Sequence, residues 1–184
     1  MQIIGGTAKG FRLRGPGGGK ARPIPGNIKK SLFDILTPYI PGSRCLDLFA
    51  GTGAIGIEAL SRGAQWVTFV ECSPRMIRVI SGNLDTTGFD GLAKVIRGDV
   101  RRVIASLHRY GESFQIIFMD PPYGHGLASE TLDIISANMV LDSDGIIVSR
   151  HETGEKMPKA SGALELTRQE KYGDNRISFY MLKK

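Results

Sequence analysis

The stretch LDLFAGTGAIGIEAL, residues 46–60, decides the fold of this chain. Its glycines at positions 51, 53 and 56 have the spacing G-x-G-x-x-G, and Glu71 follows twenty positions after the first of them. A strand that leads through such a loop into a helix is typical of Rossmann-like nucleotide sites. Asp47, however, lies inside the apolar strand, where its carboxylate would repel a diphosphate. The loop therefore favours a cationic ligand over a dinucleotide.

The composition is that of one globular domain. The chain has 184 residues, of which 41% are hydrophobic and 23% are charged, and it is long enough to bury a core. Its longest apolar runs have the length of a strand, so we expect neither a membrane span nor a signal peptide. Cys45 and Cys72 lie in strand-like segments and lack a metal-ligand spacing. This pattern predicts two buried thiols, no bound metal and a reducing, cytoplasmic location.

Positive charge gathers near the N-terminus. Seven lysines and arginines, interspersed with glycines and prolines, precede the first acidic residue, Asp34, while the whole chain carries a net charge of +6. Such a basic segment is the usual footprint of nucleic-acid binding, although a solvated tail would look the same. We expect residues 1–26 to form a basic hairpin and linker and residues 27–184 to form the main domain. The candidate nucleic-acid-binding residues are Lys9, Arg12, Arg14, Lys20 and Arg22.

Strand and helix patterns alternate along the rest of the chain. Asn27 is placed to cap a first helix, whose apolar positions recur at helical spacing until Pro38. The alternation predicts an α/β fold in which helices cover both faces of a mostly parallel sheet. The segments 163–172 and 177–182 predict an antiparallel pair that closes one edge of it. The other predicted strands are residues 44–49, 66–71, 94–97, 115–119 and 145–149, and the later helices are residues 54–62, 74–86, 100–109 and 127–139.

A second motif, FMDPPYGHG at residues 118–126, directly follows the fourth predicted strand. If the first and fourth strands are neighbours, this turn and the glycine loop face one crevice. The Asp120 carboxylate and the Pro121 carbonyl can then accept the two N–H bonds of an exocyclic amine on a nucleobase, which frees the nitrogen lone pair for attack. Tyr123 offers a flat face to a base that has left its stack. A plain strand-ending turn is the alternative interpretation.

The carboxylates near the glycine loop indicate which electrophile the amine would attack. S-adenosylmethionine carries a sulfonium and an ammonium, and both suit a site that contains Asp47. Glu71, at the end of the second strand, is placed to accept the ribose hydroxyls. Asp99 is a candidate for the adenine amino group, with Val100 beside the ring, but Asp99 is equally well explained as a helix N-cap.

Three motifs together resemble the RsmD-type methyltransferases: LDLFAGTG at residues 46–53, DPPY at residues 120–123 and KYGD at residues 171–174. The resemblance extends over nearly the whole chain. It implies a seven-stranded, Rossmann-like class I methyltransferase fold, S-adenosylmethionine as methyl donor, and the exocyclic N2 of a guanine in small-subunit (16S) ribosomal RNA as target. The expected catalytic residues are Asp120, Pro121 and Tyr123. The expected cofactor-binding residues are Asp47, Phe49, Ala50, Gly51, Gly53, Glu71, Cys72, Asp99 and Val100.

One segment departs from that family pattern, and other functions compete. Residues 24–31 lack the Thr, Asp and Glu-Ala positions that the family usually has there, so their contribution to donor binding is in question. DNA adenine-N6 methylation uses the same Asp-Pro-Pro-Tyr chemistry and is the main alternative. An NAD-dependent oxidoreductase and a non-catalytic RNA-binding module are lesser ones. We expect direct in-line transfer by a monomer whose partner is ribosomal RNA or the small ribosomal subunit.

Overall fold

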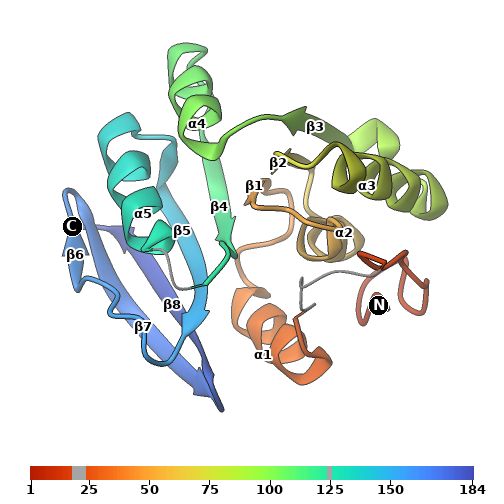
Figure 1. Ribbon diagram of the computed structural model, residues 1–184, viewed down its shortest axis with the longest axis horizontal. Coiled ribbons are helices and arrows are strands. Elements are labelled where there is room, and N and C mark those ends of the chain that lie inside the picture. The colour runs from red at the N-terminus through yellow and green to blue at the C-terminus, as the bar shows by residue number, and fades with distance from the viewer. Residues whose placement is uncertain (18–23, 124–125) are drawn as a thin grey trace.

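The computed structural model describes residues 1–17, 24–123 and 126–184. Within these residues the strands form one sheet of eight, in the order β3-β2-β1-β4-β5-β8-β7-β6 (Figure 1). The first five strands are parallel, and β8 runs antiparallel to both of its neighbours, β5 and β7. The strands are β1 (Arg44–Leu48), β2 (Trp66–Glu71), β3 (Ala93–Arg97), β4 (Phe114–Met119), β5 (Leu141–Glu152), β6 (Ala160–Ser161), β7 (Leu164–Tyr172) and β8 (Asn175–Leu182).

Helices cover both faces of this sheet, as the alternating pattern predicted. Apolar side chains of the first three helices and of residues 3–13 pack into one core cluster, and those of the last two helices pack into a second cluster on the other face. The helices are α1 (Gly26–Leu36), α2 (Ala54–Ser61), α3 (Pro74–Thr87), the short η1 (Asp90–Leu92), α4 (Val100–Arg109) and α5 (Leu127–Asn138). The predicted α/β fold is confirmed.

The predicted antiparallel pair at one edge is confirmed as β7 and β8. Three details of the sequence-based prediction are wrong. The sheet has eight strands instead of seven, because the two-residue β6 is too short to leave a pattern in the sequence. Asn27 does not cap α1, which already begins at Gly26 and has Pro25 at its N-cap. Cys72 is exposed, because β2 ends one residue before it.

The N-terminal residues pack onto α2 instead of projecting from the domain. A single antiparallel bridge joins Gln2 to Arg12 and closes a hairpin, although it does not extend into regular strands. The backbone N–H of Ile4 donates to Glu58 Oε2 over 2.9 Å, and that of Thr7 donates to the Ser61 carbonyl over 2.7 Å. The hairpin side chains Ile3, Ala8 and Leu13 are buried in the cluster beneath α1 and α2.

A buried ion cluster joins the hairpin to α1 and α2. Glu58 is fully buried, and its carboxylate accepts from Lys29 Nζ and Arg62 Nε, each over 2.9 Å. Lys29 Nζ also donates to the Gln2 carbonyl over 2.6 Å. Lys29 is one of the seven N-terminal cations, but it is paired within the fold, so the charge it adds to the surface is small.

The third glycine of the G-x-G-x-x-G pattern has a packing role. Gly56 lies in α2 where the helix crosses the sheet, and a Cβ on it would come within 2.3 Å of the Phe69 ring and 2.8 Å of Val67. The absence of a side chain therefore brings the start of α2 close to β1 and β2. This close approach lets the backbone N–H of Gly56 reach Asp47 Oδ2, over 3.0 Å.

Candidate active site

The two sequence motifs meet at one edge of the sheet. Strands β1 and β4 are adjacent and parallel, with Leu48 opposite Met119, so the glycine loop and the Asp-Pro-Pro-Tyr turn leave neighbouring strands in the same direction. The strand order reverses between these two strands, and such switch points are where open α/β sheets bind ligands. In Figure 1 the arrowhead of β4 points toward α1, which lies below this edge. The predicted meeting of the motifs is confirmed.

A small cavity opens at this edge beside α1. Its polar lining consists of Asp47 from β1, Asp120 after β4 and Arg150 from β5. Ile24 and Leu32 contribute to its apolar wall, so the segment that departs from the family pattern does border the site. The remaining lining residues are Ile55, Phe118, Met119, Val148 and Ile177.

The glycine loop turns sharply because three of its residues adopt left-handed backbone conformations. Gly51 has φ +55° and Gly53 has φ +76°, which glycine accepts without strain. Phe49 has φ +60°, a conformation that is unfavourable for a side chain of this size and that costs on the order of 1–3 kcal/mol. Strain of this kind collects at functional sites, and here it lies within the first motif. The Ala50 N–H donates to the Val70 carbonyl over 3.0 Å and fixes the loop against β2.

Asp47 is buried under the loop, with 3% of its surface exposed. Its Oδ2 accepts from the Gly56 N–H at the start of α2. Burial raises the pKa of Asp47 to about 7; the Gly56 hydrogen bond acts in the opposite direction, and the nearby carboxylates of Asp120 and Glu71 add to the rise. A cation placed in this cavity would therefore be attracted to Asp47 and would favour its ionised form.

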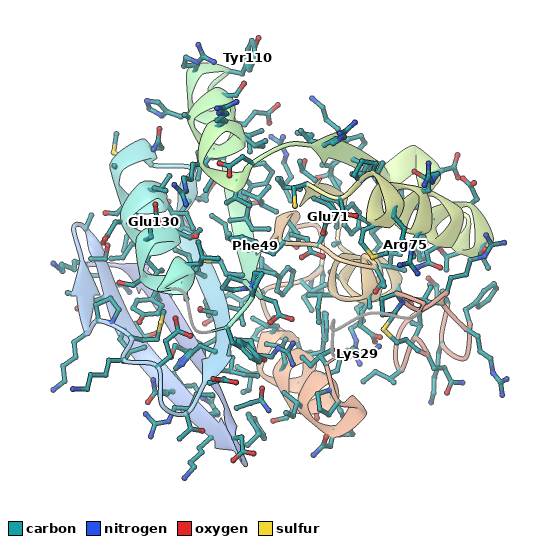
Figure 2. The ribbon with its side chains drawn as sticks, in the orientation of Figure 1. Lys29, Phe49, Glu71, Arg75, Tyr110 and Glu130 are labelled. Atoms are coloured by element: carbon teal, nitrogen blue, oxygen red, sulfur yellow. The ribbon has the colours of Figure 1, made fainter. Side chains whose placement is uncertain are left out.

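Glu71 connects the glycine loop to the turn after β2. Its Oε2 accepts from the Gly51 N–H and its Oε1 accepts from the Ser73 N–H, both over 2.8 Å. Figure 2 labels Glu71 and Phe49 near this edge. A carboxylate has about four acceptor positions, and the Cys72 thiol also donates to Oε1, so about one position stays open to a ligand hydroxyl. Cys72 Sγ lies 3.6 Å from Glu71 Oε1, and burial raises the pKa of this thiol although the residue is exposed overall.

Asp99 follows β3 at the same edge and caps α4. Its Oδ1 accepts from the Arg101 N–H over 3.0 Å, which agrees with the helix-cap interpretation of this residue. Asp99 is exposed and Val100 is buried, so the carboxylate keeps acceptor positions that a ligand can reach. Recognition of an adenine amino group by Asp99 stays a prediction.

The Asp-Pro-Pro-Tyr turn is fixed by side chains from β5 and β8. Arg150 binds Asp120 in a bidentate ion pair, with Nε to Oδ1 at 2.8 Å and Nη2 to Oδ2 at 2.7 Å. The central carbon of the Arg150 guanidinium lies 5.5 Å from the centre of the Tyr123 ring. The Tyr123 hydroxyl donates to Asn175 Oδ1 over 2.9 Å, and burial raises the pKa of Tyr123 to about 12, so this phenol stays protonated at neutral pH.

Sequence reasoning missed Arg150 and Asn175. Arg150 carried one usable signal, because an arginine near the end of an otherwise buried strand needs a carboxylate partner. Phe118 pairs with Val148 in the sheet, so Asp120 and Arg150, two residues further along, point from adjacent strands to the same face. Asn175 carried no signal, since its contact with Tyr123 depends on how β8 enters the sheet.

The candidate nucleic-acid-binding residues lie on the N-terminal hairpin. Lys9, Arg12 and Arg14 are all exposed there. Arg14 is anchored through its backbone, whose N–H donates to Asn83 Oδ1 of α3 over 2.7 Å, so its side chain is left to solvent. Lys20 and Arg22 lie outside the described residues.

Within residues 1–17, 24–123 and 126–184, none of the helices has both the length and the apolar character needed to cross a membrane. In the same residues, no group of three or more histidine, cysteine or acidic side chains is arranged to hold a metal ion.

Comparison with known proteins gives matches over almost the entire chain. The profile of the family described as conserved hypothetical protein 95 matches residues 1–181. "Putative rRNA methyltransferase YlbH" of Bacillus subtilis is 37% identical over 180 residues, which cover 98% of each protein. "Ribosomal RNA small subunit methyltransferase D" of Escherichia coli is 32% identical over 180 residues, which cover 98% of this chain and 89% of that one.

Solved structures agree with these matches. "Putative methyltransferase yhhF from Escherichia coli" superposes with a TM-score of 0.88 at 32% identity, covering 100% of this chain and 98% of the other. The shared architecture includes the mostly parallel sheet and the antiparallel C-terminal strands. This chain therefore belongs to the conserved hypothetical protein 95 family, alongside methyltransferases of the RsmD and YlbH type.

Proposed function

We propose that this protein is an S-adenosylmethionine-dependent ribosomal RNA methyltransferase that modifies the exocyclic N2 of a guanine in the small-subunit RNA. The observation that carries the proposal is the position of Asp120 and Asp47 in one cavity, where the glycine loop meets the Asp-Pro-Pro-Tyr turn. The first carboxylate suits an amine that must donate hydrogen bonds, and the second suits a cation. A methyl transfer from a sulfonium to an amine needs both.

The residues at the edge of the sheet fit this donor. Asp47 and the backbone of residues 49–53 would border its charged amino-acid end, Glu71 keeps an acceptor position for a ribose hydroxyl, and Asp99 and Val100 lie after the next strand. When bound, the donor supplies an electrophilic methyl group. Asp47 would hold the donor's positive charge without a water shell, since it is buried.

The acceptor side would work by positioning the amine. The lone pair of an exocyclic guanine nitrogen is delocalised into the ring, so it is a weak nucleophile. When Asp120 Oδ and the Pro121 carbonyl accept its two N–H bonds, the lone pair is directed at the methyl group. Tyr123 supports the extruded base. Holding the reacting atoms about 3–3.5 Å apart is worth several kcal/mol, and the surplus proton passes to water after transfer.

Ribosomal RNA is favoured over DNA by the kind of surface available. RNA is recognised through shape, loops and backbone, which a compact basic hairpin with Lys9, Arg12 and Arg14 can contact. Reading a DNA sequence in the major groove requires an element that enters the groove and contacts base edges. The names of the relatives, an rRNA methyltransferase and a small-subunit methyltransferase, point to the same substrate class.

A methyl-transfer assay tests the proposal. The purified chain is mixed with tritiated S-adenosylmethionine and, in separate arms, small ribosomal subunits that lack native methylation, naked 16S RNA and unmethylated DNA. We expect N2-methylguanosine in digests of a ribosomal arm and no label in DNA. Methylated adenine in the DNA arm would replace the proposal with the DNA alternative. A chain that gains thermal stability from NAD but not from the donor would replace it with an oxidoreductase.

The role of the hairpin needs a milder test than its removal. Deleting residues 1–20 would expose the core beneath α2 and leave Glu58 without its Ile4 partner, so weaker binding would have two causes. Replacing Lys9, Arg12 and Arg14 together by Gln keeps the buried residues. We expect the slope of log affinity for the RNA against log salt to fall by about one for each phosphate that the hairpin no longer neutralises. The matched control is Lys183→Gln and Lys184→Gln at the exposed end of β8, which should leave the slope unchanged.

A further inference from the structure

We propose that Arg150 is a positioning residue for methyl transfer: its guanidinium fixes the direction of the Asp120 carboxylate and holds the Tyr123 ring beside it. This inference rests on the proposed function, because it assigns to Arg150 a part in presenting the substrate amine. It concerns a residue outside both sequence motifs, on a strand that neither motif touches in the sequence.

The ion pair leaves Asp120 able to serve a substrate. Both N–H groups of the guanidinium fork approach the carboxylate, one to each oxygen, at 2.8 and 2.7 Å. A carboxylate bound in this bidentate way keeps one acceptor position on each oxygen, directed away from the arginine. The Asp120 side chain is 31% exposed and the Arg150 side chain is 10% exposed, and both line the cavity, so the carboxylate is the more accessible member of the pair. Arg150 thereby sets the direction from which a substrate N–H can donate to Asp120.

Arg150 is well placed to hold another group still. Its backbone lies inside the sheet, where β5 pairs with β4 on one side and Arg150 faces Ile177 of β8 on the other. A site built on a strand between two paired neighbours is more rigid than one built on a loop. Asp120, by contrast, is the first residue of the turn after β4, and the ion pair connects it to this rigid strand.

Tyr123 is held by the same arrangement. One face of its ring is turned to the guanidinium carbon at 5.5 Å, and its hydroxyl donates to Asn175 at the start of β8. The contact between a cation and an aromatic face is worth about 0.5–2 kcal/mol, depending on how far it is desolvated. Both ends of the Asp-Pro-Pro-Tyr turn therefore depend on β5 and β8. The opposite face of the ring is the one left for a base.

Arg150 also determines the charge of the acceptor. The ionisable groups that face Asp120 are Asp47 from β1, Tyr123 from its own turn and Arg150 from β5. The carboxylates of Glu152 and Glu155 lie further away and raise the pKa of Tyr123. Burial raises the pKa of Asp120, and the guanidinium acts in the opposite direction. Without Arg150, the burial and the neighbouring Asp47 would both favour a protonated Asp120. A protonated carboxyl accepts an amine N–H poorly, so activity would require a higher pH.

The test compares Arg150→Met and Arg150→Lys with the wild-type chain in methyl transfer to small ribosomal subunits, from about pH 5 to about pH 9. In Arg150→Met we expect the acid limb of kcat to move up by about one pH unit or more and kcat at neutral pH to fall about tenfold or more. Arg150→Lys keeps the charge but not the fork, so it should retain the acid limb and still lose kcat. Donor affinity should change less than about twofold in both variants.

Added guanidinium ion separates positioning from a general effect on folding. The ion can enter the space that a shortened side chain leaves, so it should restore part of kcat in Arg150→Ala and none in the control. The matched control is Arg176→Met, an arginine of β8 whose side chain donates to Gln169 and not to the site. Its pH profile should match that of the wild type. An Arg150→Met variant with a wild-type acid limb and kcat would overturn the inference.

A measurement without RNA keeps this inference separate from the proposed function. If the wild-type chain methylates no ribosomal substrate, the proposed function fails. The titration of the Asp120 carboxyl carbon, followed by NMR and assigned with Asp120→Asn, can still be compared between the wild type and Arg150→Met. We expect its pKa to rise in the variant. An unchanged titration would mean that Arg150 does not control Asp120.

Discussion

The two halves of the candidate site are built in different ways. On the side of β1, β2 and β3, the geometry comes from the backbone: left-handed residues turn the glycine loop, and backbone N–H groups bind Asp47, Glu71 and Asp99. On the side of β4 and β5, the geometry comes from side chains that are 30 and 52 positions apart, Asp120 with Arg150 and Tyr123 with Asn175. The first half is encoded in short continuous stretches, and the second depends on strand order.

Because of this difference, we expect substitutions in the two halves to change different properties of the enzyme. Residues around the glycine loop should change donor binding or stability, because they shape the backbone. Residues of the Asp-Pro-Pro-Tyr turn should change the rate of transfer with donor binding largely retained, because they act on the acceptor. The five predictions that follow test this division, beginning with the largest effect.

Asp120→Ala should reduce kcat by about 10²–10³-fold, since it removes the acceptor that orients the substrate amine. The Kd of the donor, measured by calorimetry, should stay within about threefold of the wild type. Asp120→Asn is the matched variant, which keeps the shape of the side chain and loses its charge. A fully active Asp120→Ala chain would remove the proposed mechanism, and a large loss of donor affinity would show that the two halves are not independent.

The affinity for the donor should depend on pH through Asp47. Its pKa in the free protein is about 7, and a bound cation favours the ionised form, so affinity should increase with pH by up to about tenfold per unit below 7 and level off above. Asp47→Asn should bind weakly and without this dependence. Calorimetric titration of the donor between pH 5 and 8 measures both. A flat profile in the wild type would contradict the position assigned to Asp47.

The raised pKa of Asp47 also determines the direction in which the stability of the fold changes with pH. The folded-state pKa of Asp47 lies above its ordinary value of 3.8, so folding disfavours the ionised form. The stability that Asp47 contributes is fully present below its ordinary pKa and is lost as the pH rises through about 7. The Tm of the donor-free wild type should therefore fall toward neutral pH more steeply than that of Asp47→Asn.

Gly56→Ala should destabilise the fold by about 1–3 kcal/mol, because its Cβ would overlap the Phe69 ring. The gain in helix propensity, about 1 kcal/mol, is too small to offset this overlap. Gly91→Ala is the matched control, since a Cβ there meets nothing within 4 Å and the backbone does not have positive φ. Chemical denaturation measures both. Equal stability of the two variants would show that α2 can shift away from the sheet at little cost.

Tyr123→Phe should have the smallest effect, a reduction of about threefold to tenfold in kcat/KM for the RNA substrate. It removes only the hydrogen bond to Asn175, worth about 0.5–1.5 kcal/mol, and keeps the aromatic face. Asn175→Ala should reproduce it, and the double variant should add little, because both changes remove the same bond. Additive losses would mean that the two side chains act separately. Tyr123→Ala, which also removes the face, should weaken binding of the base further.

Much of the fold was predictable because its signals are local. The bounds of β2 and α4 agree with the prediction at both ends, since turn residues flank each regular pattern. β5 is longer than predicted and begins at Leu141, because its first residues include Asp142, Ser143 and Asp144, which look like a loop. A register shift between Phe114 and Ile116 marks this irregular beginning. Polar residues at an irregular strand end give a pattern that alternation cannot identify.

The site shows the same limit. The motifs placed Asp47, Glu71, Asp99 and Asp120 at one edge of the sheet, because strand order follows from the fold class. Their binding roles stay predictions. Arg150 was not identified, since its partner depends on the pairing of β4 with β5 in one particular register. The buried ion pair of Lys29 was not predictable either, because the sequence shows the charge of Lys29 and not its contact with Glu58.

The docking of the hairpin on α2 has a consequence for biosynthesis. Ile4 and Thr7 bind Glu58 and Ser61, which a ribosome adds more than fifty residues later. Because chains are made from the N-terminus, at a rate of about 5–20 residues per second, the basic hairpin emerges several seconds before its partner helix exists. During that interval its cations and its apolar side chains are both exposed to the crowded, RNA-rich surroundings of translation, and only synthesis of α2 ends that exposure.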